Sequence, residues 1–307
     1  MKSLGKKKKA FTPVSQANTH TVSWKQRLGS ASFLAPSLIG VLVFFILPFM
    51  VVIYYSLVDN PISGNFVFLR NFINVFNNAA FRRAAFNTFR FSIIAVPLAV
   101  VLSLGLAVLL ESKIPLRSQF RTFFLSPMMV PVASVVLIWQ VLFHYNGAVN
   151  DALSFFGIPA IDWMKSDYSI VVIVLLFLWK NLGYNMILFM AALANIPKEM
   201  IEVARLDTSS KAQIFFRIKL RYLSPTLLFV AIFSLINSFK IFREIYLLTN
   251  DYPYDSLYML QHFMNNTFNN LDYQKLSAAA IIMAIVVVFI IGILFIAENR
   301  FGKDVEG

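Results

Sequence analysis

The chain has 307 residues, of which 58% are hydrophobic and only 14% are charged. An ordinary soluble domain is about 45–50% apolar and about 25% charged, so this chain has too few charges to cover a soluble surface. The composition excludes an ordinary soluble enzyme, a disordered chain and a coiled coil, and it indicates a membrane protein.

The formal net charge is +12, from 27 Lys and Arg against 15 Asp and Glu. Such a basic excess is typical either of nucleic-acid binding or of cytoplasmic loops in a membrane protein. The second interpretation is favoured here, because the charges are segregated between loops. The chain has no cysteine, which excludes disulfides, thiol nucleophiles and cysteine-based metal sites.

Residues 1–30 are predicted to form a basic cytoplasmic tail. Its run of lysines over 6–9 is followed by a polar stretch and not by the short apolar core of a secretory signal. We expect this tail to lie beside anionic lipid headgroups. Binding of the tail to nucleic acid is the less favoured alternative.

Six segments are long and apolar enough to cross about 30 Å of hydrocarbon as helices. They cover residues 33–57, 91–110, 123–143, 170–194, 223–248 and 277–297. Each is too long for a barrel strand, and none alternates with period two. The sequence therefore predicts an all-α membrane protein: a six-span transmembrane helix bundle over 31–298, followed by a short cytoplasmic tail over 299–307.

Lys and Arg are distributed unequally between the segments that connect these spans. The two tails and the second and fourth loops carry 18 of them, whereas the other three loops carry five. Cytoplasmic loops of membrane proteins carry the excess of Lys and Arg. Both termini and the 196–222 loop are therefore predicted to be cytoplasmic.

The sequence contains no motif for catalysis or for energy supply. It has no phosphate-binding G-x-x-x-x-G-K-[ST] loop, no G-x-S-x-G and no H-E-x-x-H. Its three histidines, His20, His144 and His262, lack the spacing of metal ligands. We predict no catalytic residue, no metal site and no cofactor on this chain, which disfavours a membrane enzyme or scaffold.

Charged residues inside spans are the usual sign of function in membranes. The predicted spans contain Lys180, Lys240, Arg243 and Glu244. We expect Lys180 to extend toward the headgroups and Glu244 to pair locally with Lys240 and Arg243; a coupling role for Glu244 is the alternative. A carrier driven by protons or sodium usually needs more acidic groups than this. The energy source is thus expected on another polypeptide, and a stand-alone secondary carrier or channel for a small polar solute remains the alternative.

The 196–222 loop predicts two helices separated by a turn. Pro197 suits the first helical position and Glu199 complements the helix N-terminus, and this helix runs to about Leu206. A second helix runs through Arg221, and any of three residues can cap it: Asp207, Thr208 and Ser209. Taken alone, this loop is an amphipathic connector on the bilayer surface.

Two stretches of this loop resemble the EAA loop of ABC-importer permeases: Glu-Val-Ala-Arg-Leu-Asp over 202–207 and Ile-Lys-Leu-Arg-Tyr-Leu-Ser-Pro-Thr over 218–226. The spacing is intact, but Val203 replaces the first alanine, Thr208 the glycine and Arg221 the proline. Residues 179–189 resemble the fourth span of sugar-uptake permeases. Over about 28–300, the chain is similar to six-span permeases of the maltose and glycerol-3-phosphate type.

This resemblance implies a bacterial inner-membrane permease subunit that translocates a sugar or oligosaccharide. It implies three protein partners besides the lipid bilayer: a second homologous permease, a cytoplasmic ATPase dimer that holds ATP and Mg, and an extracytoplasmic solute-binding protein. Nucleic acid is not among the partners. The loop helix would dock in a cleft of the ATPase. The implied coupling residues are Glu202, Val203, Ala204, Arg205, Asp207 and Thr208. Glu202 would pair with a basic group, and the small Ala204 would allow close approach.

Sugars are bound by aromatic faces and by side-chain hydrogen bonds. The fourth and fifth spans offer both, and the candidate substrate path comprises Trp179, Tyr184, Asn185, Asn237, Lys240 and Arg243. The two amides, Asn185 and Asn237, are the strongest candidates, because amides in lipid need an inward partner. Lipid-facing aromatic belts are the alternative for the rings.

Overall fold

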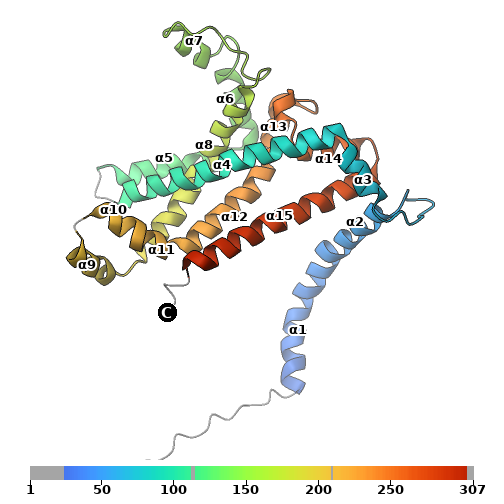
Figure 1. Ribbon diagram of the computed structural model, residues 1–307, viewed down its shortest axis with the longest axis horizontal. Coiled ribbons are helices and arrows are strands. Elements are labelled where there is room, and N and C mark those ends of the chain that lie inside the picture. Colours follow the sequence, from blue (N-terminus) through green and yellow to red (C-terminus); the bar gives the residue numbers. More distant parts are fainter. Residues whose placement is uncertain (1–23, 112–114, 209, 303–307) are drawn as a thin grey trace, which may run out of the picture. The chain divides into compact units, whose positions relative to one another are not determined.

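The computed structural model describes residues 24–111, 115–208 and 210–302. Within these residues every regular element is helical, apart from one isolated bridge between Val58 and Phe66. The predicted all-α class is therefore confirmed (Figure 1). Most of the tail predicted over 1–30, and residues 303–307 of the C-terminal tail, lie outside the described residues.

The chain divides into two compact units that meet between Val51 and Val52. The first unit contains α1 (Trp24–Val41), a π-helical turn η1 (Leu42–Ile46) and the start of α2 (Leu47–Leu57). Phe33–Leu57 is continuously helical and apolar over 25 residues, which is long enough to cross a membrane.

The second unit holds the rest of α2 and all the remaining helices. In chain order these are α3 (Arg70–Asn77), α4 (Ala79–Glu111), α5 (Arg117–Met129), α6 (Val132–Leu142), α7 (Ala148–Ser154), α8 (Ser169–Ala194), α9 (Lys198–Asp207), α10 (Lys211–Ile214), η2 (Phe215–Lys219), α11 (Leu220–Tyr222), α12 (Ser224–Lys240), α13 (Phe242–Thr249), η3 (Asp255–Leu257), α14 (Leu260–Asn269) and α15 (Tyr273–Gly302).

Five helical segments of the described chain are long and apolar enough to cross a membrane. They are Phe33–Leu57, Ala79–Glu111, Ser169–Ala194, Ser224–Thr249 and Tyr273–Arg300, and they match five of the six predicted spans. The second of them begins at Ala79 and not near residue 91, because its polar start is also packed inside: Asn87 and Thr88 are both buried.

The predicted span over 123–143 is not one straight helix. Helices α5 and α6 follow each other with a bend of 102°. Pro131 has no N–H to continue the helical hydrogen bonds, and Val130 before it is extended, with φ −83° and ψ 129°. The described residues therefore give five spans, or six if this bent pair counts as one.

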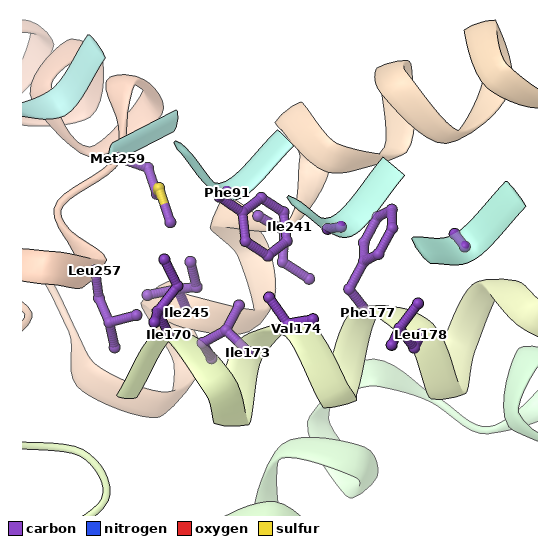
Figure 2. Packing of buried hydrophobic residues seen from close by; sticks show 12 residues of the cluster. Phe91, Ile170, Ile173, Val174, Phe177, Leu178, Ile241, Ile245, Leu257 and Met259 are labelled. Carbon is purple, nitrogen blue, oxygen red and sulfur yellow. The ribbon is translucent and has the colours of Figure 1, made fainter. Parts of the chain in front are cut away.

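Close packing of α4 on α8 forms the framework of the second unit. A stripe of small residues, Ala95, Ala99, Ser103 and Ala107, repeats every four positions along α4 and is fully buried. Small side chains let two helix backbones approach closely in a membrane. At one end of this seam the ring of Phe91 meets that of Phe177 edge-on, with centroids 5.5 Å apart (Figure 2).

Gly183 lets α5 lie directly against α8. A Cβ atom added at Gly183 would run into the backbone carbonyl of Phe124 on α5. The glycine thus fixes the bent α5–α6 pair beside the middle of α8, which is where the cavity described next is found.

Candidate functional site

A cavity of about 540 Å³ lies among α5, α6, α8, α12, α13 and α14. Its polar lining consists of Lys180, Asn181, Tyr184, Asn237, Lys240, Arg243, Glu244 and Gln261. Four of the six candidate path residues are therefore brought together: Tyr184, Asn237, Lys240 and Arg243. A volume of this size is ordinary for a small-molecule site.

One wall of the cavity is aromatic. The rings of Tyr184 on α8 and Phe233 on α12 are 4.9 Å apart between centroids, and Phe229 stacks on Phe233 one turn earlier. Sequence analysis missed Phe233, although it lies four residues before Asn237 and so shares a helix face with it. The wall offers the kind of apolar face on which a sugar ring packs.

The amides on the wall link two helices. Asn237 donates its Nδ2 hydrogen to Oδ1 of Asn181 at 2.9 Å, which joins α12 to α8. An asparagine side chain has two donors and one acceptor oxygen with two lone pairs. Because both residues line the cavity, their remaining hydrogen-bonding capacity is available to a ligand.

Asn185 and Trp179 lie apart from the cavity. Asn185 is fully buried and donates to Oγ of Ser234 at 2.9 Å, so it clamps α8 to α12. The ring of Trp179 packs on Trp139 of α6, with centroids 5.2 Å apart. The structure thus places these two candidates between helices, where the sequence alone could not distinguish packing from binding.

The charged residues of the spans pair differently from the expectation. Glu244 accepts a hydrogen bond from Nζ of Lys180 on α8, and does not join Lys240 and Arg243 in a local cluster. Lys180 lies on the neighbouring helix α8, 64 positions before Glu244, so the pairing follows the packing of the helices and not the local sequence. The expectation that Lys180 extends toward the headgroups was also wrong, because Lys180 forms an ion pair between helices.

His262 on α14 directly follows the lining residue Gln261 in the chain. It is fully buried, its Nδ1 accepts from the backbone N–H of Met259 at 3.2 Å, and its ring meets Phe242 edge-on. Burial lowers the pKa of His262 to about 4. At neutral pH this imidazole is therefore uncharged and adds no positive charge beside the cavity.

The 196–222 loop forms a second candidate site. Glu199 lies in the first turn of α9 as predicted, while Pro197 precedes that helix as its N-cap residue. Three apolar residues, Met200, Val203 and Leu206, are exposed at 43%, 59% and 87% and form a stripe with a spacing of three.

The coupling residues of α9 divide between two faces. Glu202, Val203 and Arg205 are exposed, but Ala204 is only 7% exposed. Ala204 is thus covered by other residues of the chain, and its close approach to the ATPase stays a prediction. Of Asp207, only the backbone lies within the described residues, as the last residue of α9.

The second helix of the loop starts one residue later than predicted. Ser210 is its cap and accepts from the backbone N–H of Gln213, whereas Thr208 donates to Oε1 of Gln213 at 2.7 Å. Thr208 is extended, with φ −150°, so a β-branched residue fits where the family pattern has glycine. Ser209 lies outside the described residues.

The far end of the loop is tied to two spans. Lys219 donates to both carboxylate oxygens of Glu111, the last residue of α4, at 2.7 and 2.6 Å. Ser224 donates to Glu298 of α15 at 3.0 Å. Sequence analysis missed both pairs, since their partners are far apart along the chain. They anchor the loop while α9 keeps its exposed stripe.

Comparison with known proteins identifies the family of this chain. The model of the "Binding-protein-dependent transport system inner membrane component" family matches residues 95–306. The chain belongs to this family. The match includes the cavity lining and the whole 196–222 loop, so both candidate sites of this inner membrane component lie in the family's shared region.

Two relatives and one solved structure illustrate the likeness. The trehalose/maltose transport system permease protein MalF of Thermococcus litoralis is 30% identical over 94% of this inner membrane component and 99% of its own length. The sulfoquinovosyl glycerol transport system permease protein SmoG of Agrobacterium fabrum is 29% identical over 84% and 86%.

A chain from the structure of a bacterial alginate ABC transporter, in complex with an alginate pentasaccharide-bound periplasmic protein, superposes with a TM-score of 0.78. It covers 91% of this inner membrane component and 96% of that chain at 20% identity. The predicted ABC importer permease fold is therefore confirmed.

Proposed function

We propose that this chain is the permease subunit of an ATP-binding cassette importer that moves a sugar or oligosaccharide across the cytoplasmic membrane. The observation that carries the proposal is the cavity in which aromatic faces and amides converge, in a chain of this transport family. The names of MalF and SmoG, which both specify carbohydrate transport, support the choice of substrate.

The proposed coupling device is α9. Its exposed stripe of Met200, Val203 and Leu206, with Glu202 beside it, suits a groove on a partner protein, where a short helix binds by its apolar face. Closure of the groove would move α9 as a rigid lever. The Lys219–Glu111 ion pair gives this motion a direct route into α4.

The partners follow from this role. A second permease subunit would complete the pathway, and a cytoplasmic ATPase dimer would hold ATP and Mg and hydrolyse the nucleotide. A solute-binding protein would deliver the sugar from outside. In this arrangement both termini and the 196–222 loop lie in the cytoplasm, as the distribution of Lys and Arg predicts.

Reconstitution tests the proposal. The chain, its second permease and the ATPase are purified together and placed in proteoliposomes with the binding protein outside. We expect sugar uptake only with all components present and with ATP on the side of the ATPase. Sugar uptake by the purified chain alone, driven by a gradient without ATP, would instead establish the stand-alone carrier.

The native absence of cysteine allows a simple test of orientation. Single-cysteine variants Glu202→Cys on α9 and Asp151→Cys on α7 are each exposed to solvent. In intact cells, an impermeant thiol reagent should label the variant at 151 and leave the one at 202 unlabelled until the membrane is opened. Labelling of position 202 from outside would contradict the coupling role.

A further inference from the structure

We propose that the transported sugar carries an anionic group, such as a carboxylate, phosphate or sulfonate, which Lys240 and Arg243 bind in the cavity. The inference rests on the proposed function and narrows its substrate class. Three observations support it: the charge balance of the cavity, the position of the two cations in a span, and the neutral groups beside them.

The charge balance of the cavity is positive. Its lining contains Lys180, Lys240 and Arg243 against one carboxylate, Glu244. Glu244 is buried, and its carboxylate accepts a hydrogen bond from Lys180. Among the described residues, Lys240 and Arg243 have no ion-pair partner. Two positive charges of the cavity are therefore left uncompensated by the part of the chain that the structure describes.

Lys240 and Arg243 both lie within the apolar segment Ser224–Thr249. Placing a Lys or Arg side chain in hydrocarbon is costly, and such residues usually face a water-filled path or a polar partner. Lys240 and Arg243 are exposed and line the cavity. Their position is thus explained if the cavity is part of an aqueous path that an anion enters.

The cavity combines two kinds of binding group: cationic side chains for an anionic group, and neutral amides and an aromatic ring for a sugar body. Arg presents a planar fork that matches a carboxylate or phosphate, and Lys acts as a point charge beside it. The Asn181–Asn237 amide pair and the Tyr184 ring line the same cavity. These neutral groups suit the hydroxyls and the face of a sugar ring. The site therefore fits a ligand with one charged group on a neutral sugar body.

Matched sugar pairs test the inference in the complete importer. Proteoliposomes containing both permeases and the ATPase, with the binding protein outside, are offered glycerol 3-phosphate against glycerol, cellobiouronic acid against cellobiose, and sulfoquinovose against glucose. We expect at least ten-fold faster ATP-dependent uptake of the acidic member in at least one pair. In the double variant Lys240→Gln/Arg243→Gln, that uptake should fall at least ten-fold.

The matched control is Arg82→Gln/Lys165→Gln, which removes the same charge from exposed positions outside the cavity. We expect this control to keep its uptake within two-fold of wild type. Both double variants are checked for membrane abundance and for co-purification of the ATPase.

The possible failures are distinguishable. Uptake of neutral members alone, or acidic uptake unchanged in the cavity variant, overturns the anionic substrate and leaves the proposed sugar import standing. An equal loss in the control variant shows that general electrostatic attraction, and not the cavity, favours the anion, and it also overturns the inference. Sugar uptake by the purified chain alone, driven by a gradient without ATP, would instead overturn the proposed function itself.

Discussion

The Lys180–Glu244 ion pair offers a quantitative test of how the spans are held together. The carboxylate side chain is 6% exposed and the ammonium side chain 23% exposed. Removing one partner of a buried pair costs about 3–5 kcal/mol, because the other charge stays buried alone. We expect each single variant to lower the free energy of unfolding by about 3 kcal/mol, the lower end of this range, because Lys180 borders the cavity and is partly hydrated there.

Lys180→Met and Glu244→Gln, singly and together, form a double-mutant cycle. The double variant leaves no unpaired charge, so it should lower the free energy of unfolding by no more than either single variant does. The coupling between the two sites is then about 3 kcal/mol. The free energy of unfolding is measured by SDS titration of the purified chain in mixed micelles, followed by tryptophan fluorescence.

The exposed pair Arg83–Asp255 supplies the matched control. Its side chains are 56% and 73% exposed, with a distance of 2.6 Å between Nη1 and Oδ1. An exposed pair contributes about 0–1 kcal/mol. Arg83→Met and Asp255→Asn should therefore each change the free energy of unfolding by less than about 1 kcal/mol. If the costs of Lys180→Met and Glu244→Gln simply add, or match those of this surface pair, the assignment of a buried clamp is refuted.

Three further predictions concern other parts of the molecule. Glu202→Lys should insert normally and keep its ATPase partner but lose ATP-driven uptake, measured in proteoliposomes. Gly183→Ala should lower the free energy of unfolding by about 1–3 kcal/mol, because the new methyl group displaces the Phe124 backbone. The third concerns His262, whose pKa of about 4 lies below the usual 6.5: its contribution to stability, present above pH 6.5, should be lost as the pH falls toward 4. Between pH 6.5 and pH 4 the free energy of unfolding should fall by about 3 kcal/mol in total, measured by SDS titration at a series of pH values.

Each of these three predictions has a control variant. Asp151→Lys makes the same charge change on an exposed residue of α7 and should leave uptake intact. Gly105→Ala adds a methyl group where nothing lies within 4 Å, so it should stabilise α4 by up to about 1 kcal/mol. His262→Gln should remove the pH-dependent loss between 6.5 and 4. An unchanged pH profile in that variant would assign the loss to other groups.

The spans were predictable from the sequence because hydropathy and length act locally. Five predicted segments correspond to helices of sufficient length, and Pro131 was visible in the sixth. The sharp bend at that proline was not predictable, since a proline inside a span only weakens the helix, and neighbouring helices decide whether it kinks. The one-residue error in the loop, with Ser210 as the cap, is of the same local kind.

The candidate path was predictable by residue type but not by pairing. Tyr184 and Asn237 could be chosen because polar and aromatic groups in spans tend to face inward. Lys180 and Glu244 are 64 positions apart, and nothing in either local sequence indicates the other. Tertiary contacts therefore decided which charges are neutralised.

The stripe of small residues on α4 has a mechanical consequence for transport. Alanine has no rotamers to change, so the three alanines of this stripe favour a single packing of α4 on α8. During a transport cycle we expect α4 and α8 to move together as one rigid body. We then expect the chain to flex elsewhere, at the Val130–Pro131 corner, where α5 and α6 meet with a bend of 102° beside the cavity.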